Sequence, residues 1–226
     1  MHRSKRYRSN KELIENSKLH SIDEAIEIIQ KLNQAKFDET VEVHFRLNIN
    51  PEKTEQQVRG NVELPHGTGK KVRIAVFAEG ASVLNKAKKA GAEVVGGDDL
   101  IEEIRTKGKI NFDIAIATPD MMPKLAKIAK VLGPKGLMPN PKSETVTAEV
   151  EKAVSQLAKG KITFKSDKLG NVHVALGKIS FDPQALKENY ELLKKALEKL
   201  KPSGIKGKYF RSITLTSTMG PGLKLA

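Results

Sequence analysis

The sequence of 226 residues contains no cysteine and no tryptophan, and aromatic residues make up only 4% of it. The absence of cysteine excludes disulfides and thiolate metal sites, and it is typical of proteins in a reducing compartment. No apolar run approaches the roughly 20 residues that a membrane-spanning helix requires. The basic first residues also lack the apolar stretch of a secretory signal. We therefore expect a soluble, cytoplasmic protein with no membrane partner.

Motifs that mark the common enzyme classes are also missing. The segment 67–71 superficially resembles a phosphate-binding loop, but Lys71 stands where that loop requires Ser or Thr, and the segment precedes a strand. Residues 79–82 lack the glycine spacing of a dinucleotide site. There is no GxSxG or HExxH motif, and the five histidines show no metal-ligand spacing. We expect no enzymatic activity, no metal and no cofactor.

Positive charge is abundant. The sequence has 40 Lys and Arg residues against 27 Asp and Glu residues, which gives a formal net charge of +13. A field of this sign attracts polyanions. Nucleic acid is therefore the expected partner. An anionic membrane surface is the second candidate for such a charge, and we do not expect it to be the partner.

Two styles of β-strand occur in different parts of the sequence. From Val41 to Ile49 apolar and polar residues alternate, which predicts a strand with one buried and one solvated face. The same alternation returns near the C-terminal end, where a hairpin turn at 167–170 separates two further strands. Between these regions lie continuous apolar runs that alternate with helical patterns, and this order predicts a parallel, three-layer α/β sheet. The runs are 74–78, 92–95 and 114–117, and one of the helices is expected over 123–132.

This order predicts an α/β domain inserted into an α+β domain. The outer, α+β domain would join residues 1–67 to 160–226, and the inserted, Rossmann-like domain would span 68–159. Glycine-bearing segments at 65–69 and 159–161 would be hinges. In the outer domain, a capping box predicts a helix that begins after Ser21, and Asp182-Pro183 predicts a second helix.

Polar side chains share one face of the outer strands. Because side chains alternate along a strand, the even-numbered residues of each strand lie on one side. Hydroxyls and a carboxylate suit the 2′-hydroxyls and base edges that the shallow minor groove of RNA exposes. The alternative interpretation is an ordinary solvated face of a sheet. The residues concerned are Thr40, Glu42, His44, Arg46 and Asn48, and Ser212, Thr214, Thr216 and Thr218.

A loop at 133–142 contains three prolines and two glycines, which exclude both helix and central strand. It follows a lysine-rich amphipathic helix, contains no acid, and keeps Leu137 and Met138 among cations. A rigid connector between helices would explain the prolines but not these apolar residues.

This helix and loop resemble the signature of the universal large-subunit ribosomal protein L-one family, of the bacterial type. Residues 36–43 resemble the family's first RNA-contacting segment, and Ser212 with 216–221 resembles its second. The resemblance therefore covers essentially the whole chain. One departure is Arg46, which stands where the family often has Lys and should change the hydrogen-bond geometry.

The resemblance implies specific site residues. The core rRNA contacts would be Lys36, Phe37, Thr40, Glu42, Arg46, Ser212, Thr218, Met219 and Gly220. Supporting RNA contacts would come from Arg3, Lys5, Arg8, Asp167 and Lys168. The signature loop is represented by Gly133, Pro134, Lys135, Gly136, Pro139 and Asn140.

The resemblance also implies a function. The protein would be a structural constituent of the 50S ribosomal subunit that binds 23S rRNA and forms a mobile stalk, which aids the release of exit-site tRNA. It would also repress its own operon by binding an mRNA element that imitates the rRNA site. Two alternatives stay open. A free RNA chaperone or regulatory RNA-binding protein shares the basic charge, whereas a nucleotide-using α/β enzyme would need a phosphate-cradling loop that we do not find.

Overall fold

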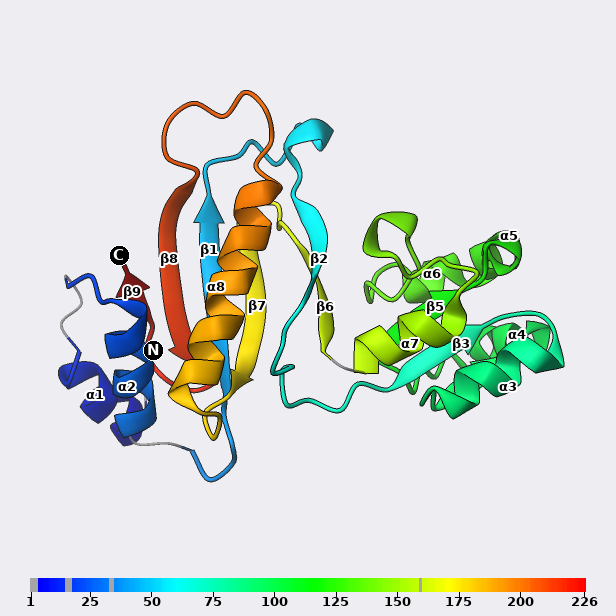
Figure 1. The fold of residues 1–226 in the computed structure, drawn as a ribbon, viewed down its shortest axis with the longest axis horizontal. Coiled ribbons are helices and arrows are strands. Elements are labelled where there is room, and N and C mark those ends of the chain that lie inside the picture. The colour runs from blue at the N-terminus through cyan, green and yellow to red at the C-terminus, as the bar shows by residue number, and fades with distance from the viewer. Residues whose placement is uncertain (1–3, 15–17, 33–34, 159) are drawn as a thin grey trace. The chain divides into compact units, whose positions relative to one another are not determined.

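The computed structural model describes residues 4–14, 18–32, 35–158 and 160–226. The chain forms two compact units, an outer unit of Met1–Lys70 with Ile162–Ala226 and an inserted unit of Lys71–Lys161. Figure 1 shows both. Within the described residues, none of the helices has the length and apolar character needed to cross a membrane. Of the expected second hinge, Lys159 lies outside the described residues.

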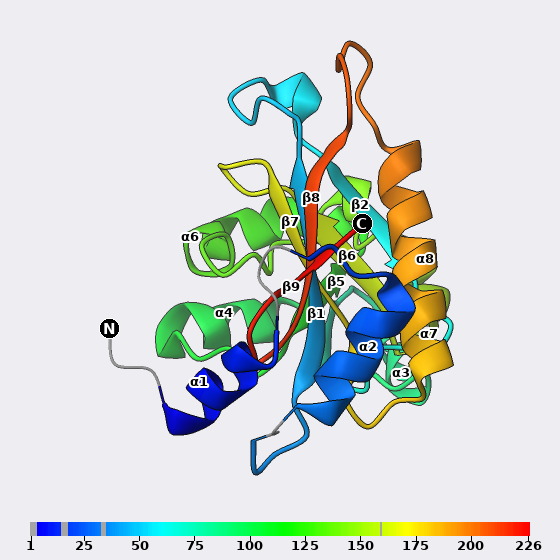
Figure 2. The same ribbon diagram turned by 90° about the vertical axis from the view of Figure 1, so that its left-hand side faces the viewer.

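The outer unit is built on a four-stranded antiparallel sheet with the order β7-β1-β8-β9. Alternating residues give each strand one apolar face, and that face packs against helices (Figures 1 and 2). Phe45 is fully buried in this core and stacks on Tyr190 with ring centroids 6.2 Å apart. The strands are β1 (Thr40–Leu47), β7 (Asn171–Lys178), β8 (Phe210–Ser217) and β9 (Leu223–Leu225).

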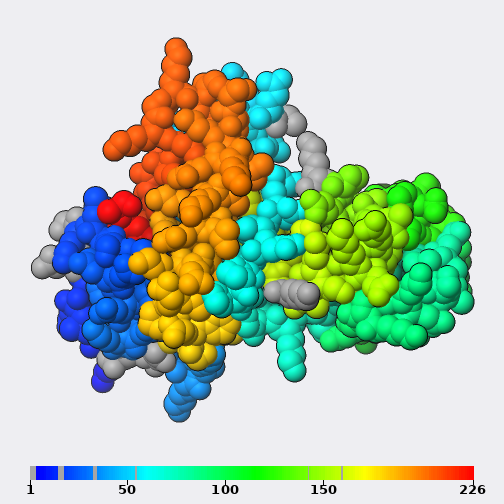
Figure 3. Space-filling model, viewed as in Figure 1, coloured from blue at the N-terminus to red at the C-terminus, as the bar shows by residue number. Residues whose placement is uncertain are grey.

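Among the described residues, this unit has three α-helices: α1 (Lys5–Glu12), α2 (Ile22–Lys31) and α8 (Pro183–Lys199). The predicted capping box of α2 is confirmed, because the Ser21 side chain accepts from the Glu24 N–H and the Glu24 side chain accepts from the Ser21 N–H. The predicted start of α8 is confirmed too, with Asp182 as its N-cap. Between α8 and β8, the loop of residues 200–209 protrudes beyond the end of the sheet (Figures 1 and 3).

The expected hairpin around residues 167–170 is wrong. β6 (Lys161–Lys165) pairs with β2 (Arg59–Glu63) in a separate two-stranded sheet, whereas β7 pairs with β1. The reason is a non-local contact at the end of β6. The Ser166 N–H donates to the Val58 carbonyl at 2.8 Å, and the Val58 N–H donates to Ser166 Oγ at 3.1 Å. The turn therefore connects two sheets.

The first crossing between the units differs from its expected place. The boundary follows Lys70 instead of Gly67, because residues 66–69 are attached to the outer unit. Asn189, fully buried on α8, donates from Nδ2 to the Gly67 carbonyl at 3.1 Å. His66 Nε2 lies 2.7 Å from Glu188 Oε2. These contacts leave 65–69 fixed to the outer unit.

The inserted unit has the predicted three layers. Its parallel sheet has the order β4-β3-β5, and apolar clusters cover both faces. One cluster includes residues of α3 and α7, and the other includes residues of α4 and the segment 121–132. The elements are β3 (Ile74–Phe77), β4 (Val94–Gly96), β5 (Ile114–Ala117), α3 (Ala81–Lys89), α4 (Asp98–Lys107) and α7 (Val150–Ala158).

The helix expected over 123–132 is not continuous. Two short helices, α5 (Met122–Leu125) and α6 (Ala129–Leu132), flank a 3₁₀ turn at Ala126–Ile128. The turn keeps Leu125 and Ile128, which are three residues apart, buried on one side.

The signature loop, residues 133–142, follows α6. The structure explains why this loop contains two apolar residues. Leu137 and Met138 pack against the core of the inserted unit. The Asn140 N–H donates to Thr145 Oγ1 at 2.8 Å, which closes the loop. Gly136 has a φ of 71°, a conformation that favours glycine. The loop is therefore a structural part of the inserted unit.

Candidate nucleic-acid interface

The polar rows of β1 and β8 lie side by side on the sheet face opposite α2 and α8 (Figure 2). In the antiparallel register, Glu42 lies opposite Thr216. Further along, His44 is opposite Thr214 and Arg46 is opposite Ser212. The alternate residues of these strands are buried in the core, so the polar row faces outward. The fold thus gathers residues from opposite ends of the sequence on one surface.

Two histidines meet in the middle of this polar face. His44 of β1 is opposite His173 of β7, and their Nδ1 atoms are 2.8 Å apart, so one ring donates to the other. His44 Nε2 is also 3.9 Å from Glu42 Oε2. Burial, together with the neighbouring His173, lowers the pKa of His44, although Glu42 partly opposes the shift. The centre of the face therefore carries a hydrogen-bonded histidine pair in which burial disfavours the charged form of His44.

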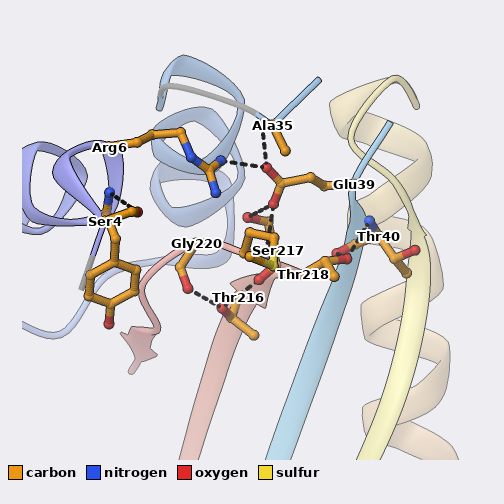
Figure 4. A network of polar contacts seen from close by, with 11 residues as sticks. Ser4, Arg6, Ala35, Glu39, Thr40, Thr216, Ser217, Thr218 and Gly220 are labelled. Carbon is orange, nitrogen blue, oxygen red and sulfur yellow. Dashed lines mark hydrogen bonds and ion pairs between the residues drawn. The ribbon is translucent and has the colours of Figure 1, made fainter. Parts of the chain in front are cut away.

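At one end of the face, the buried carboxylate of Glu39 joins three separate segments (Figure 4). It accepts hydrogen bonds from Ser217 Oγ at 2.7 Å and from the Met219 N–H at 2.9 Å. It also accepts from the Ala35 N–H at 2.7 Å and pairs with Arg6 Nη1 at 3.1 Å. One side chain thus connects α1 with the two segments that the family resemblance marks as RNA contacts, 36–43 and 216–221.

The charge of Glu39 is stabilised by these donors. Burial raises the pKa of Glu39, but the hydrogen bond from Ser217 and those from Met219, Ala35 and Arg6 outweigh burial and lower the pKa. Sequence reasoning missed this residue, although a signal existed. Glu39 occupies the same side of the alternation as Val41 and Val43, which is the core side, and a buried acid requires partners.

Thr218 is held by the end of β1. Its hydroxyl accepts from the Thr40 N–H at 3.0 Å and donates to the Thr40 carbonyl at 3.3 Å. The Thr40 hydroxyl in turn accepts from Lys178 Nζ at 3.0 Å. The two threonines that the family resemblance predicts as RNA contacts therefore also hold the start of β1 to the chain just after β8, and each keeps hydrogen-bonding capacity for a ligand.

The turn after β8 depends on Gly220. Thr216 Oγ1 donates to the Gly220 carbonyl at 3.3 Å. A Cβ atom on Gly220 would lie 2.4 Å from Ser217 Oγ, the same hydroxyl that donates to Glu39. Phe37 and Met219 stay 54% and 51% exposed near this turn, so apolar surface is available to a ligand.

Asp167 and Lys168, which the resemblance predicts as supporting RNA contacts, lie in the turn before β7 and have different roles. Asp167 accepts from the Leu169 N–H at 2.8 Å and from the Asn171 N–H at 2.6 Å, so its carboxylate shapes the turn. Burial raises the pKa of Asp167, but the hydrogen bonds, chiefly from Asn171, lower it below its ordinary value. Lys168 is exposed on this turn. Asp167 is thus occupied by local contacts, and Lys168 is the cation that the turn presents.

The predicted basic N-terminal arm is a helix. Lys5 and Arg8 are exposed on α1, which Ser4 caps by accepting from the Tyr7 N–H. Arg3 lies outside the described residues. Lys36 is exposed beside Phe37. Within the parts of the chain that the structure describes, no group of three or more His, Asp or Glu residues could hold a metal ion.

Comparison with known proteins decides the family. The model of the Ribosomal protein L1p/L10e family matches residues 29–221. The chain belongs to the ribosomal protein L1 family. A curated relative from Persephonella marina, a large ribosomal subunit protein uL1, is 50% identical over 226 residues, covering 99% of this chain and 93% of the relative. The uL1 of Fervidobacterium nodosum is 48% identical over 222 residues, covering 98% and 94%.

Membership in the L1 family makes the protein a structural constituent of the large ribosomal subunit and not an enzyme. The predicted family, and with it the predicted absence of enzymatic activity, is confirmed. The matched region contains both contact segments, Glu39 and the signature loop.

Proposed function

We propose that the polar face of the outer unit, with the Glu39-centred end, binds 23S rRNA in the large ribosomal subunit. The cross-strand register of β1 and β8 is the observation that supports this proposal most directly. It makes one surface from the residues that the family resemblance assigns to two distant segments. Arg46 and Lys36 would hold phosphates, whereas the hydroxyls of Ser212 and Thr218 would read ribose groups.

Glu42 gives the face its preference for RNA of a particular shape. Phosphates repel a carboxylate, so Glu42 would accept a hydrogen bond from a base or from a ribose 2′-hydroxyl. Phe37 and Met219 would pack against bases or riboses at the same end. Hydroxyls, a carboxylate and exposed apolar groups fit a folded RNA better than a uniform lysine surface would.

The proposal includes the finer roles that the family resemblance implies. As part of a mobile stalk, the protein would aid the release of exit-site tRNA, with the inserted unit moving relative to the outer one. By binding its own operon mRNA, it would repress translation in the cytoplasm. If both RNAs use the same face, each should displace the other from it.

Cross-linking followed by footprinting on total RNA of the native organism tests the proposal. We expect protection of one folded region of 23S rRNA, with cross-links to segments 36–42 and 212–220. A sucrose gradient should place the protein with the large subunit. Cosedimentation only with free RNA would favour the alternative of an RNA chaperone. With the protected fragment, log K against log[salt] should fall with a slope of at least about −3.

A further inference from the structure

A β-bulge changes the direction of one arginine at the end of the polar face. Arg46 lies opposite Ser212, but the next residue of β1, Leu47, lies opposite Phe210. Arg211 is therefore an extra residue in β8, and such a bulge re-aims side chains. Arg211 and Ser212 are both exposed, whereas Phe210 and Ile213 pack on the core. The bulge thus places Arg211 beside Ser212 on the polar side.

Asn48 holds the guanidinium of Arg211 in place. Arg211 donates to Asn48 Oδ1 from Nε at 3.0 Å and from Nη2 at 2.7 Å. Asn48 is itself fixed, because its Nδ2 donates to the Lys206 carbonyl at 3.2 Å and its backbone N–H donates to the Tyr209 carbonyl at 2.7 Å. This geometry orients Arg211 and leaves the Nη1 hydrogens for another acceptor.

No carboxylate compensates the charge at this end. Arg6 and Arg73 pair with Glu39 and Asp113. Among the residues that the structure describes, neither Arg46 nor Arg211 has a carboxylate within ion-pair distance. Two exposed guanidinium groups at adjoining positions repel each other, and a bridging anion relieves that repulsion.

The neighbouring loop adds lysines and no acid. Residues 201–208 include Lys201, Lys206 and Lys208, and all three are exposed. Lys206 and Lys208 lie between two residues that pack on the core, Ile205 and the buried Tyr209. The chain on both sides of these two lysines is therefore fixed to the outer unit. Figure 2 shows the loop projecting beyond the sheet, and Figure 3 shows its atoms at the surface. A polyanion lying along the polar face could thus continue onto this loop.

We propose that Arg211, with Arg46, Lys206 and Lys208, forms a clamp for RNA backbone phosphates at this end of the polar face. The inference rests on the proposed function and extends the RNA site to a residue outside both predicted contact segments. A guanidinium fixed by Asn48 can present two N–H groups to one phosphate, which gives geometric selectivity as well as charge.

The test uses the full chain and the 23S rRNA fragment that footprinting defines. Arg211→Gln should weaken binding about 10- to 100-fold. It should also make the salt slope less steep by about 0.7–0.9. Arg211→Lys should recover the salt slope but only part of the affinity, because an ammonium lacks the fork. Lys195→Gln removes the same charge from an exposed position on α8, on the opposite side of the sheet, and should leave binding unchanged.

Asn48→Ala tests the positioning step. It should weaken binding in the wild-type background and have little further effect in the Arg211→Gln background. Wild-type affinity and salt slope in Arg211→Gln would overturn the clamp, and so would an equal loss in Lys195→Gln. If the wild-type protein itself protects no 23S rRNA, the proposed function fails instead. Circular dichroism on each variant verifies the fold, and Arg211→Lys keeps the test decisive if Arg211→Gln is destabilised.

Discussion

The hydroxyl of Thr218 hydrogen-bonds both backbone groups of Thr40, accepting from its N–H at 3.0 Å and donating to its carbonyl at 3.3 Å. The backbone N–H of Thr218 donates to the same carbonyl at 3.0 Å. The first residue of β1 and the start of the turn at 218–221 are therefore joined by both the backbone and the side chain of Thr218. Thr218, a residue of the proposed RNA contact, therefore also stabilises the outer unit.

Replacing Thr218 with Val measures how much the hydroxyl contributes to folding stability and how much it contributes to rRNA binding. The substitution keeps the size and β-branching but leaves the Thr40 N–H without its side-chain acceptor. We expect the free energy of unfolding to fall by about 0.5–1.5 kcal/mol, and rRNA binding to weaken by about 1–3 kcal/mol. Thermal melts and filter binding on the same preparations measure both. Thr163→Val, at an exposed position of β6, is the matched control and should change neither. Binding that weakens no more than stability would mean a purely structural role.

Glu39→Gln should destabilise the outer unit and displace the contact segments. The amide keeps the shape but replaces an acceptor oxygen with a donor, so it faces donors such as the Met219 N–H. We expect a loss of about 2–3 kcal/mol in the free energy of unfolding near neutral pH. Affinity for rRNA should fall as well. Glu27→Gln removes the same charge from an exposed pair on α2 and should have a small effect.

The Glu39→Gln effect should depend on pH with a defined sign. The folded-state pKa of Glu39 is lowered from its ordinary value of 4.5. Its stabilising contribution is therefore fully present above that value and is lost as the pH falls through the folded-state pKa. The difference in unfolding free energy between wild type and variant should shrink on acidification below about pH 4.5. Urea titrations across this range measure it, and a difference that grows on acidification would contradict the assignment.

The pattern of apolar residues in the sequence predicted most of the fold. The alternation of β1 predicted which side chains face the core, and the apolar runs predicted the parallel sheet, because both patterns are local consequences of burial. The pairing of β6 with β2 was not predictable, since it depends on the contact between Ser166 and Val58 across the sequence. Arg211 escaped prediction for a similar reason. A bulge is a property of two strands in register.

Gly220→Ala tests whether the side chain of Ser217 leaves room only for glycine at position 220. The new Cβ would lie 2.4 Å from Ser217 Oγ and would push the hydroxyl away from Glu39. We expect the variant to lose stability and rRNA affinity together, by about 1–3 kcal/mol for strain in a packed site.

A double-mutant cycle checks the cause. Ser217→Ala alone costs the hydrogen bond to Glu39, but it removes the atom with which the new Cβ collides. Adding Gly220→Ala to Ser217→Ala should therefore cost much less than adding it to the wild type. Additive losses, measured by urea unfolding, would show that something other than this contact requires glycine.

The outer unit should retain the rRNA site when the inserted unit is removed. A chain in which residue 70 is joined to residue 162 through a short glycine linker keeps every residue of the polar face, the Glu39 contacts and the bond from Asn189 to Gly67. Because its core is continuous across both segments, we expect it to fold cooperatively, as circular dichroism and a thermal melt would show. Its affinity for the 23S rRNA fragment should stay within about tenfold of the full chain. A folded chain that binds more than about a hundredfold more weakly, equivalent to ~2.7 kcal/mol, would place essential contacts in the inserted unit. Joining residue 67 to residue 160 should be less stable, because it removes Gly69, which packs against Phe181 and Lys178.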